Sequence, residues 1–378
     1  MTNEFEIGPI RPPSESKSLL LRVTRNCSWN KCKFCSLYKD HKFSTRSVED
    51  IKADIDRIAQ YVGDIHSRLS EQPARSGLLG KVDAFPKEKR QRYLYLLQWI
   101  SNGEESVFLQ DANTLVLSFD KLQEILTHLR KKLPQVKRVT SYGRVDSLSK
   151  FSAGQLTELR QAGLDRIHSG YESGSDKVLE LINKGYTKAQ EIDAGLKVKD
   201  SGIELSIYFM PGVGGRDLSE SNALETADVI NNINPDFVRI RTFVSHLGTG
   251  LDDDIRAGRI KDCTDKEKML ELKKMIENIT CADGHLFSDH VINLLENVNG
   301  NMNSDKAKML SEFSAFEQLY IPTQKKYQIA RRLGMIGSPS DLELLSGEHL
   351  SVVNNYLEQL DTEHKFESFI LSCLRRYI

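Results

Sequence analysis

The stretch "LLLRVTRNCSWNKCKFCSLYK", from Leu19 to Lys39, decides how the rest of the chain is interpreted. It opens with an apolar run, Leu19 to Val23, of the kind that forms a buried strand. Three of the six cysteines in the chain, Cys27, Cys32 and Cys35, follow directly after that run. A strand that ends in a cysteine-rich loop therefore begins the organised part of the sequence.

Five more strand-like runs follow the first one, and helical patterns separate them. They begin near Ser106, Val136, Leu164, Ile203 and Asp236. Strands that alternate with helices predict a parallel sheet with right-handed crossovers. Six such units between residues 19 and 245 favour an α/β fold built as a partial (β/α)6 TIM-type barrel over a complete eight-fold barrel.

The helical patterns also predict how the chain is divided. "RSVEDIKADIDRIAQYV" has helical spacing, with Ser47 as its N-cap. We expect the core barrel over residues 1–250, with a helical insertion at about 61–105 that contains "LYLLQWI". The strand signal ends near Leu251, so residues 251–378 are predicted to form a helical C-terminal region. One helix expected there is "HVINLLENV", capped by Ser288 or Asp289.

Composition and charge describe an ordinary globular chain of 378 residues, with 39% hydrophobic and 28% charged residues. The formal net charge of −1 creates no basic field, so nucleic acid is not indicated as a partner. No signal peptide and no run long enough to cross a membrane is found. Six scattered cysteines do not form a disulfide framework, and we expect a cytoplasmic protein with reduced thiols.

The three clustered thiols leave two kinds of site open. A tetrahedral structural zinc site needs a fourth ligand, which His41 could supply. Three thiolates can instead hold three irons of a [4Fe–4S] cluster and leave the fourth iron open for a ligand. The loop follows the carboxyl end of a strand, where barrel enzymes build their active sites.

With Phe34 before the last cysteine, in "CKFC", the loop resembles that of the radical SAM superfamily. The resemblance implies that Cys27, Cys32 and Cys35 hold a [4Fe–4S] cluster whose open iron binds S-adenosylmethionine. It further implies reductive cleavage of that cofactor to a 5′-deoxyadenosyl radical, with a reductant such as flavodoxin or ferredoxin. The chain departs from the usual spacing because four residues, Ser28 to Lys31, separate the first two cysteines instead of three.

A second stretch, "GLDRIHSGYESGSDKVLELINKG", resembles the branch that contains oxygen-independent coproporphyrinogen oxidase, the methylthiotransferases and Elongator-type cores. The resemblance implies that Glu172 binds the ribose or the ammonium group of S-adenosylmethionine. A solvated glutamate before a helix cap is the alternative. After the next strand run, Ser206 and Tyr208 lie on one face, and the glycines after Pro211 would allow a close approach of the cofactor.

Other polar residues at predicted strand ends are further candidates. Asp111 is the candidate to bind the cofactor's amino group, because the glycine motif that members of the resembled family often carry after this strand is missing here. The alternative is that Asp111 is a structural cap. Arg144 could pair with the cofactor carboxylate or with Glu172, or lie on the surface. Arg239 and Arg241 point to one face of a strand, where buried arginines would need anionic partners.

One further group of titratable side chains lies later in the sequence. Near the C-terminal region, "CADGHLFSDHVINLLENVNG" gathers Cys281, His285, Asp289 and His290, but no spacing suggests a second cluster. The competing functions are a non-catalytic binding protein stabilised by zinc or an iron–sulfur cluster, and an electron-transfer protein, which would lack a fourth cysteine. The substrate, a small molecule or otherwise, and the catalytic residues stay unknown at this level.

Overall fold

A computed structural model of the chain describes residues 4–71, 85–280 and 282–377. The chain forms two compact units. Unit 1 consists of Met1–Trp29, Asp40–Ser169 and Lys197–Glu204, and unit 2 consists of Asn30–Lys39, Gly170–Leu196 and Leu205–Ile378. The fold is α/β, with a mostly parallel sheet and surrounding helices, as the sequence predicts.

Unit 1 contains the first four predicted strands in the order β1-β4-β5-β6, all parallel. They are β1 (Leu19–Arg22), β4 (Ser106–Gln110), β5 (Arg138–Tyr142) and the first part of β6 (Arg166–Glu172). In the middle of β4, Val107, Phe108 and Leu109 are at most 1% exposed. Burial on both faces explains why these strands read as continuous apolar runs.

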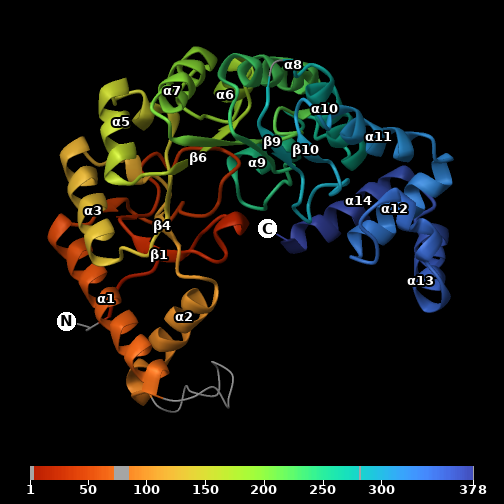
Figure 1. Ribbon diagram of the computed structural model, residues 1–378. Coiled ribbons are helices and arrows are strands. Elements are labelled where there is room, and N and C mark those ends of the chain that lie inside the picture. Colours follow the sequence, from red (N-terminus) through yellow and green to blue (C-terminus); the bar gives the residue numbers. More distant parts are fainter. Residues whose placement is uncertain (1–3, 72–84, 281, 378) are drawn as a thin grey trace. The chain divides into compact units, whose positions relative to one another are not determined.

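Helices α1 (Val48–Glu71), α3 (Phe119–Lys132) and α5 (Ala153–Ala162) lie side by side in unit 1 (Figure 1). The predicted cap of α1 is confirmed, since the Asp50 backbone N–H donates to Ser47 Oγ at 3.1 Å. "LYLLQWI" lies in α2 (Arg90–Ser101), again as predicted. The rest of the predicted insertion falls partly on residues 72–84, which lie outside the described residues.

Unit 2 continues the strand order as β6-β7-β8-β9-β10. Its strands are the end of β6, β7 (Glu204–Phe209, from Leu205 on), β8 (Phe237–Ile240), β9 (His285–Phe287) and β10 (Asn299–Asn301). Strand β9 is parallel to β8, and β10 is antiparallel to β9. The expectation that strands end near Leu251 was therefore wrong, because two three-residue strands without an apolar run carry no pattern that periodicity can detect.

The helix predicted for "HVINLLENV" is also wrong, because residues 290–298 form turns between β9 and β10. The backbone there binds distant side chains instead of its own next turn. The Leu294 carbonyl accepts from Tyr327 Oη at 2.9 Å, and the Leu295 carbonyl accepts from Ser288 Oγ at 2.9 Å. Tertiary hydrogen bonds have thus replaced the helical ladder that the local pattern favours.

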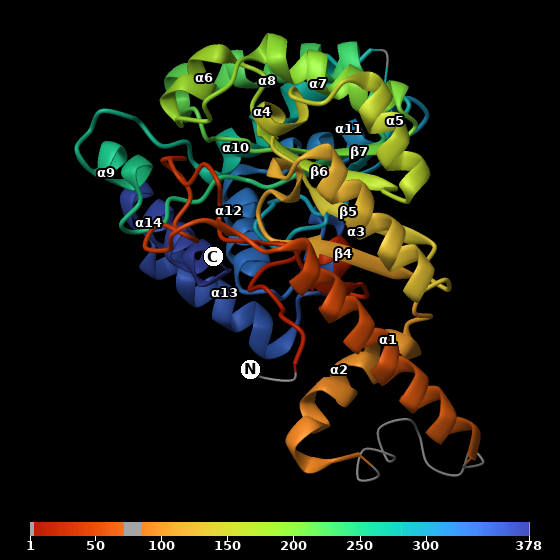
Figure 2. The same ribbon diagram turned by 90° about the vertical axis from the view of Figure 1, so that its left-hand side faces the viewer.

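The other predicted helices of unit 2 are present, and α9 is a short helix that the sequence patterns did not indicate. They are α6 (Asp176–Leu181), α7 (Lys188–Asp200, to Leu196 in this unit), α8 (Gly215–Ile233), α9 (Gly250–Arg256), α10 (Asp265–Glu277), α11 (Lys306–Glu317), α12 (Ile321–Arg332), α13 (Gly347–Gln359) and α14 (Glu363–Leu374). Helix α10 packs between α8 and α11, while α12 contacts α13 and α14 (Figure 2).

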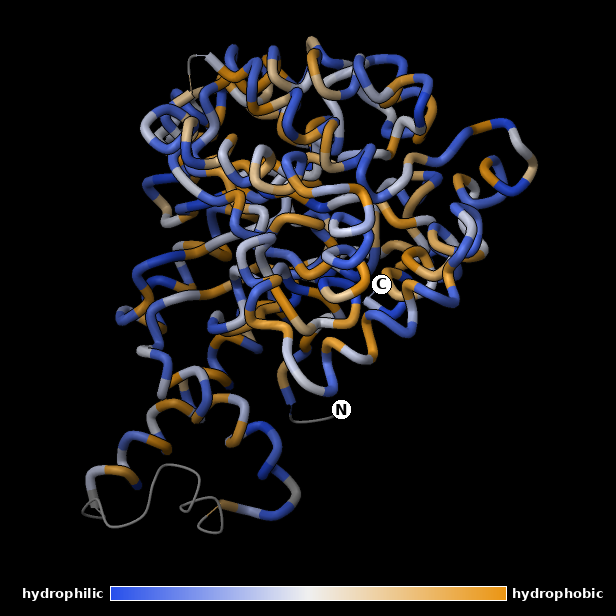
Figure 3. The backbone as a smooth tube through the Cα atoms, turned by 90° about the vertical axis from the view of Figure 1, so that its right-hand side faces the viewer, coloured by the Kyte–Doolittle hydropathy of each residue, from blue (hydrophilic) through white to orange (hydrophobic). Residues whose placement is uncertain are grey.

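The helices alternate apolar and polar stretches along the chain, as expected where one side faces a core (Figure 3). No helix in the described ranges has the length and apolar character needed to cross a membrane. The predicted division of the chain at residue 250 stays a prediction.

Candidate active site

A short pair of strands in unit 1 flanks the cysteine loop. After β1, strand β2 (Thr24–Arg25) pairs with β3 (Ser44–Thr45) in antiparallel register, and this pair closes the loop at both ends. Asn26 adopts φ 67°, a left-handed conformation that asparagine tolerates, and its Nδ2 donates to the Lys42 carbonyl at 2.7 Å. The chain is therefore anchored immediately before Cys27.

Asp111, directly after β4, binds the residues that lead into the cysteine loop. Its side chain is fully buried, and Oδ2 accepts from Arg22 at 2.9 Å and from the Asn26 backbone N–H at 3.2 Å. Glu6 bridges Arg22 and Arg25, and the hydrogen bond from Arg25 lowers the pKa of Glu6. The structure thus places Asp111 at the entry of the cysteine loop, while its predicted contact with a cofactor amino group stays a prediction.

Asn113 joins the same loop to the segment after β5. Its Nδ2 donates to Ser28 Oγ at 2.9 Å, and its Oδ1 accepts from the Arg144 backbone N–H at 3.1 Å. The Arg144 guanidinium lies 5.2 Å from the centre of the Trp29 ring and pairs with Asp146 at 2.8 Å. Arg144 is thus brought to the cysteine loop, where it stacks on Trp29.

The middle of the loop, Asn30–Lys39, belongs to unit 2, together with Cys32 and Cys35. Lys33 fixes it, because its backbone N–H donates to the Ile182 carbonyl at 2.9 Å and its Nζ pairs with Asp254 at 2.9 Å. Phe34 packs against a buried apolar cluster formed by Val178, Ile182, Val213, Phe243 and Leu251. The aromatic residue of the cysteine motif therefore anchors the loop to α6, α9 and the segment after β7.

Cys27, Cys32 and Cys35 all remain thiols. Cys32 is 8% exposed, whereas Cys27 and Cys35 are half-buried. Within the part of the chain that the structure describes, no group of three or more histidine, cysteine or acidic side chains is arranged to hold a metal ion. Cys281 lies outside the described residues.

Glu172 ends β6 and forms a buried ion pair that the sequence analysis missed. Its Oε1 lies 3.3 Å from Lys184 Nζ, and the side chains of the two residues are 11% and 5% exposed. Lys184 Nζ also lies 5.7 Å from the centre of the Phe34 ring and 5.5 Å from that of Tyr186. Glu172 is therefore not a solvated loop residue, and Lys184 connects it to the cysteine motif.

Glu191 on α7 is a second buried carboxyl that the sequence analysis missed. Within the described residues neither of its carboxyl oxygens has a hydrogen-bond partner. Burial raises the pKa of Glu191 well above its usual value, with the charge of Lys184 acting in the opposite direction. The protonated form of this carboxyl is therefore favoured over the charged form by its burial. Nothing in the local pattern of an amphipathic helix distinguishes this glutamate from exposed ones.

Ser206 and Tyr208 lie on one face of β7, as predicted. Ser206 is fully buried, and its Oγ accepts from Arg239 Nε at 3.3 Å. The ring of Tyr208 lies beneath the Arg241 guanidinium, 5.7 Å from the ring centre. These two predicted cofactor contacts thus face Arg239 of β8 and Arg241, which follows that strand, in unit 2.

The glycines after β7 are required by the protein's own packing. Gly212 has φ 84°, and a Cβ there would lie 2.6 Å from the Lys268 side chain. A Cβ on Gly215 would lie 2.6 Å from Ile260. The close approach that these glycines allow is therefore one between chain segments, and the approach of a cofactor stays a prediction.

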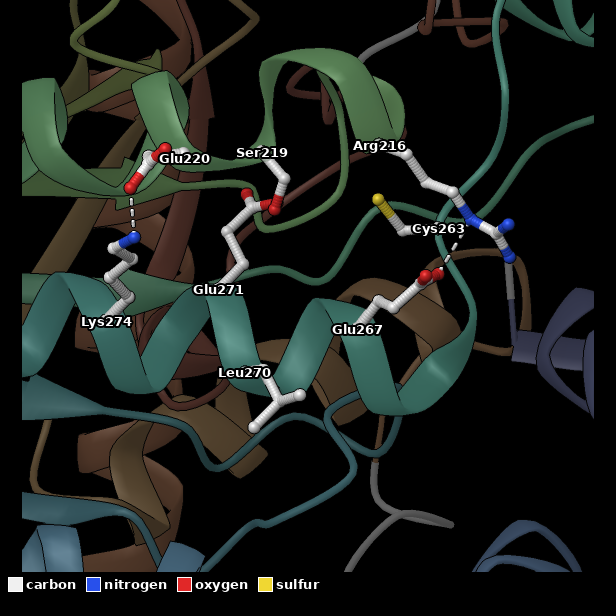
Figure 4. A pocket seen from close by; sticks show the side chains of 8 residues that line it. All are labelled: Arg216, Ser219, Glu220, Cys263, Glu267, Leu270, Glu271 and Lys274. Carbon is white, nitrogen blue, oxygen red and sulfur yellow. Dashed lines mark hydrogen bonds and ion pairs between the residues drawn. The ribbon is translucent and has the colours of Figure 1, made fainter.

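Glu271 of α10 binds the glycine loop after β7 through a backbone N–H. Its Oε1 accepts from the Gly212 backbone N–H at 2.9 Å and from Asn222 at 2.6 Å, and its Oε2 accepts from Ser219 at 2.5 Å. Burial raises the pKa of Glu271 to about 7. The carboxyl lines a cavity of about 330 Å³ between α8 and α10, whose rim carries the ion pair of Glu220 and Lys274 (Figure 4).

His285, Asp289 and His290 do not share a helix face. His285 lies in β9, with its ring 4.3 Å from that of Phe287, and the other two follow in the turns after β9. The helix that would have brought such residues onto one face is absent, because residues 290–298 form turns and bends.

Comparison with known proteins gives a family. Residues 21–227, more than half of the chain, match the Radical SAM superfamily. The tRNA uridine(34) acetyltransferase of Methanocaldococcus jannaschii is 27% identical over 115 residues, 30% of this chain and 21% of that protein. The tRNA-2-methylthio-N(6)-dimethylallyladenosine synthase of Moorella thermoacetica is 23% identical over 164 residues, 43% of this chain and 32% of that protein.

The chain thus spans about a fifth to a third of the length of these curated relatives. A solved structure, the cobalamin-dependent S-adenosylmethionine radical enzyme OxsB, is 16% identical with a TM-score of 0.45 over 96% of this chain and 53% of that chain. The superfamily match begins within β1 and covers the cysteine loop and every later strand up to β7. The chain is an enzyme, and it belongs to the radical SAM superfamily.

Proposed function

We propose that Cys27, Cys32 and Cys35 hold a [4Fe–4S] cluster and that the enzyme uses it to cleave S-adenosylmethionine reductively. When bound, the cluster and cofactor would supply a 5′-deoxyadenosyl radical that abstracts hydrogen from a substrate. The observation that carries this proposal is the three-thiol loop directly after β1, within the region that matches the superfamily. Flavodoxin or ferredoxin would be a suitable electron donor.

The residues present fit the cluster by their donor chemistry. Three thiolates on one loop bind three irons and leave one iron open, which a four-cysteine set would not do. Residues 26–43 form bends and turns without helix or strand. A metal site need not be preformed in such a segment, because binding itself orders the ligands.

The chain's own residues would position the cofactor. The Glu172 carboxylate would accept from the ribose or the ammonium group, and Lys184 would hold that carboxylate in place. Asp111 and Arg144 would act from the other strands, next to the loop entry and over Trp29. Ser206 and Tyr208 would line the same site from β7. Buried surroundings would strengthen each charged contact and exclude water.

The experiment is anaerobic reconstitution of the full chain with iron and sulfide. We expect about four iron and four sulfide per chain, and 5′-deoxyadenosine from S-adenosylmethionine after reduction by dithionite. Cys32→Ala should lose both. Cys263→Ala is the matched control, because Cys263 is 4% exposed and burial raises the pKa of its thiol to about 12, which disfavours a thiolate ligand.

Two outcomes would overturn the proposal. The first is tightly bound zinc without visible absorbance, with His41 as a fourth ligand. The second is cofactor cleavage that persists in Cys32→Ala.

A further inference from the structure

Strand β8 has two faces of opposite character. Val238 and Ile240 are fully buried, and Arg239 alternates with them. Arg241 follows directly after the strand, and its backbone N–H still donates to the Phe209 carbonyl of β7, at 2.9 Å. Arg239 is 7% exposed and Arg241 is half-buried. Two guanidinium groups therefore lie at the carboxyl end of a parallel strand.

Aromatic rings flank both guanidinium groups. In the sheet register, Arg239 lies opposite Tyr208 on β7 and Phe287 on β9. The Arg239 guanidinium lies 4.7 Å from the centre of the Phe287 ring, and that of Arg241 lies 5.7 Å from the centre of the Tyr208 ring. A guanidinium over a ring leaves its N–H edge to bind acceptors in its own plane.

The charge of Arg241 is not balanced by the chain described here. Over residues 4–71, 85–280 and 282–377 it forms no ion pair, and its guanidinium reaches only the Ile240 carbonyl, at 3.5 Å. A nearby arginine differs, since Arg331 pairs with Glu296 at 2.8 Å. A cation withdrawn from water needs an anionic partner.

The charge of Arg241 affects the pKa of His290, which lies in the turns after β9. Burial lowers the pKa of its imidazole to about 4, and the positive charges of Arg241 and Arg331 act in the same direction, against Asp289. The imidazole is therefore neutral at pH 7. It can donate or accept a hydrogen bond there without adding charge.

We propose that Arg239 and Arg241 bind an oxyanion of the substrate, a phosphate or a carboxylate group. This rests on the proposed function and specifies a substrate class for it. Guanidinium groups bind both oxyanions through paired, charge-assisted hydrogen bonds. The carboxyl end of parallel strands is the edge at which such sheets bind their ligands.

The test is calorimetric titration of the reconstituted full chain with inorganic phosphate and, separately, with acetate, at constant ionic strength. We expect one of them to bind, and Arg241→Gln to weaken that binding about tenfold or more, since a charge-assisted hydrogen bond is lost. Arg259→Gln is the matched control. Its side chain is 61% exposed and pairs with Asp254, so binding should be unchanged.

A second measurement reports on the arginines themselves. The bound anion should raise the pKa of His290 in the unsubstituted protein, because it offsets the charge of Arg241. In Arg241→Gln that pKa should already be higher and should not respond to the anion. Histidine NMR, with His290→Gln to assign the signal, measures both effects.

The outcomes separate the sources of the oxyanion. Tighter binding of phosphate indicates a phosphate-bearing substrate, and equal or tighter binding of acetate indicates a carboxylate. No binding, equal binding by Arg241→Gln, or displacement of the anion by S-adenosylmethionine would overturn the proposal. The titration needs no reduction and the cleavage assay needs no oxyanion, so failure of one leaves the other standing.

Discussion

At the scale of single residues, the ion pair of Glu172 and Lys184 joins the two stretches from which the family resemblance was argued. Glu172 ends β6, and Lys184 lies near the ring of Phe34 from the cysteine motif. Both side chains are largely buried, so each depends on the other to offset the cost of leaving water. A substitution of Glu172 should therefore affect both cofactor binding and stability.

We expect Glu172→Gln to weaken S-adenosylmethionine binding by roughly ten- to a hundredfold, because an amide replaces a charge-assisted acceptor worth about 1.5–3 kcal/mol. Titration followed by the EPR signal of the reduced cluster measures this. Glu180→Gln on α6, an exposed position, is the control and should bind normally. Unchanged affinity in Glu172→Gln would remove Glu172 from the cofactor site and leave the cysteine ligands unaffected.

The stability effect can be separated from the binding effect. Glu172→Gln leaves Lys184 buried without its carboxylate, which should lower the urea midpoint. Combining it with Lys184→Met, which removes the charge at similar volume, should restore the midpoint but not the affinity. If the double variant recovered both, the loss of affinity would have come from misfolding.

At the scale of elements, the loop after β7 depends on α10. Glu271 accepts from the Gly212 backbone N–H at 2.9 Å and fixes the position at which β7 ends and α8 begins. Its carboxyl is buried beneath that loop, and three donors satisfy it. An acidic side chain of a helix therefore positions a backbone turn at the candidate site.

We expect the buried Glu271 carboxyl to make the protein less stable as pH rises. Burial raises the pKa of Glu271 from 4.5 to about 7, so the folded state binds the proton more tightly. The contribution of this carboxyl to the free energy of unfolding, up to about 3 kcal/mol, is fully present below about pH 4.5. It is lost as pH rises through 7. We therefore expect the free energy of unfolding of Glu271→Gln, minus that of the unsubstituted protein, to be larger at pH 8 than at pH 5. Urea unfolding at the two pH values measures this difference.

The matched control for this pH dependence is Glu220→Gln. Glu220 lies on α8 beside the same cavity, is largely exposed, and pairs with Lys274, which lowers its pKa. It should not reproduce the shift. Parallel stability profiles for Glu271→Gln and the unsubstituted protein would contradict the assignment of this carboxyl.

At the scale of the whole molecule, a buried ion pair links helix α12 of unit 2 to the start of α10. Arg332 on α12 donates to Asp265 at 2.9 Å, and both side chains are 1% exposed. Asp265 is also the first residue of α10, where a carboxylate favours the positive end of the helix dipole. The attachment of α12 thus depends on the start of α10.

We expect Arg332→Met to destabilise the protein by about 3–5 kcal/mol, because Asp265 would be left charged and buried. Urea unfolding measures the loss. Lys325→Met is the control, since the pair of Lys325 with Glu363 is 28% and 67% exposed and should contribute less than about 1 kcal/mol. Equal effects of the two substitutions would show that burial of the pair does not decide its contribution.

The sequence by itself determined the six parallel strands, most of the helices and the position of the cysteine loop. These features follow from local patterns: apolar runs buried on both faces, helical spacing, and an N-cap such as Ser47. The family followed as well, because three cysteines and Phe34 lie within one short segment.

Only the tertiary structure decided which polar residues are buried and what they bind. Lys184, Glu191 and Glu271 look like ordinary helix or turn residues in the sequence, and contacts from distant segments make them buried charges or buried acids. The turns at 290–298 replaced a predicted helix because side chains far along the chain bind their carbonyls. Local patterns record the preferences of neighbouring residues, whereas burial and hydrogen bonding between remote segments arise only when the chain has folded.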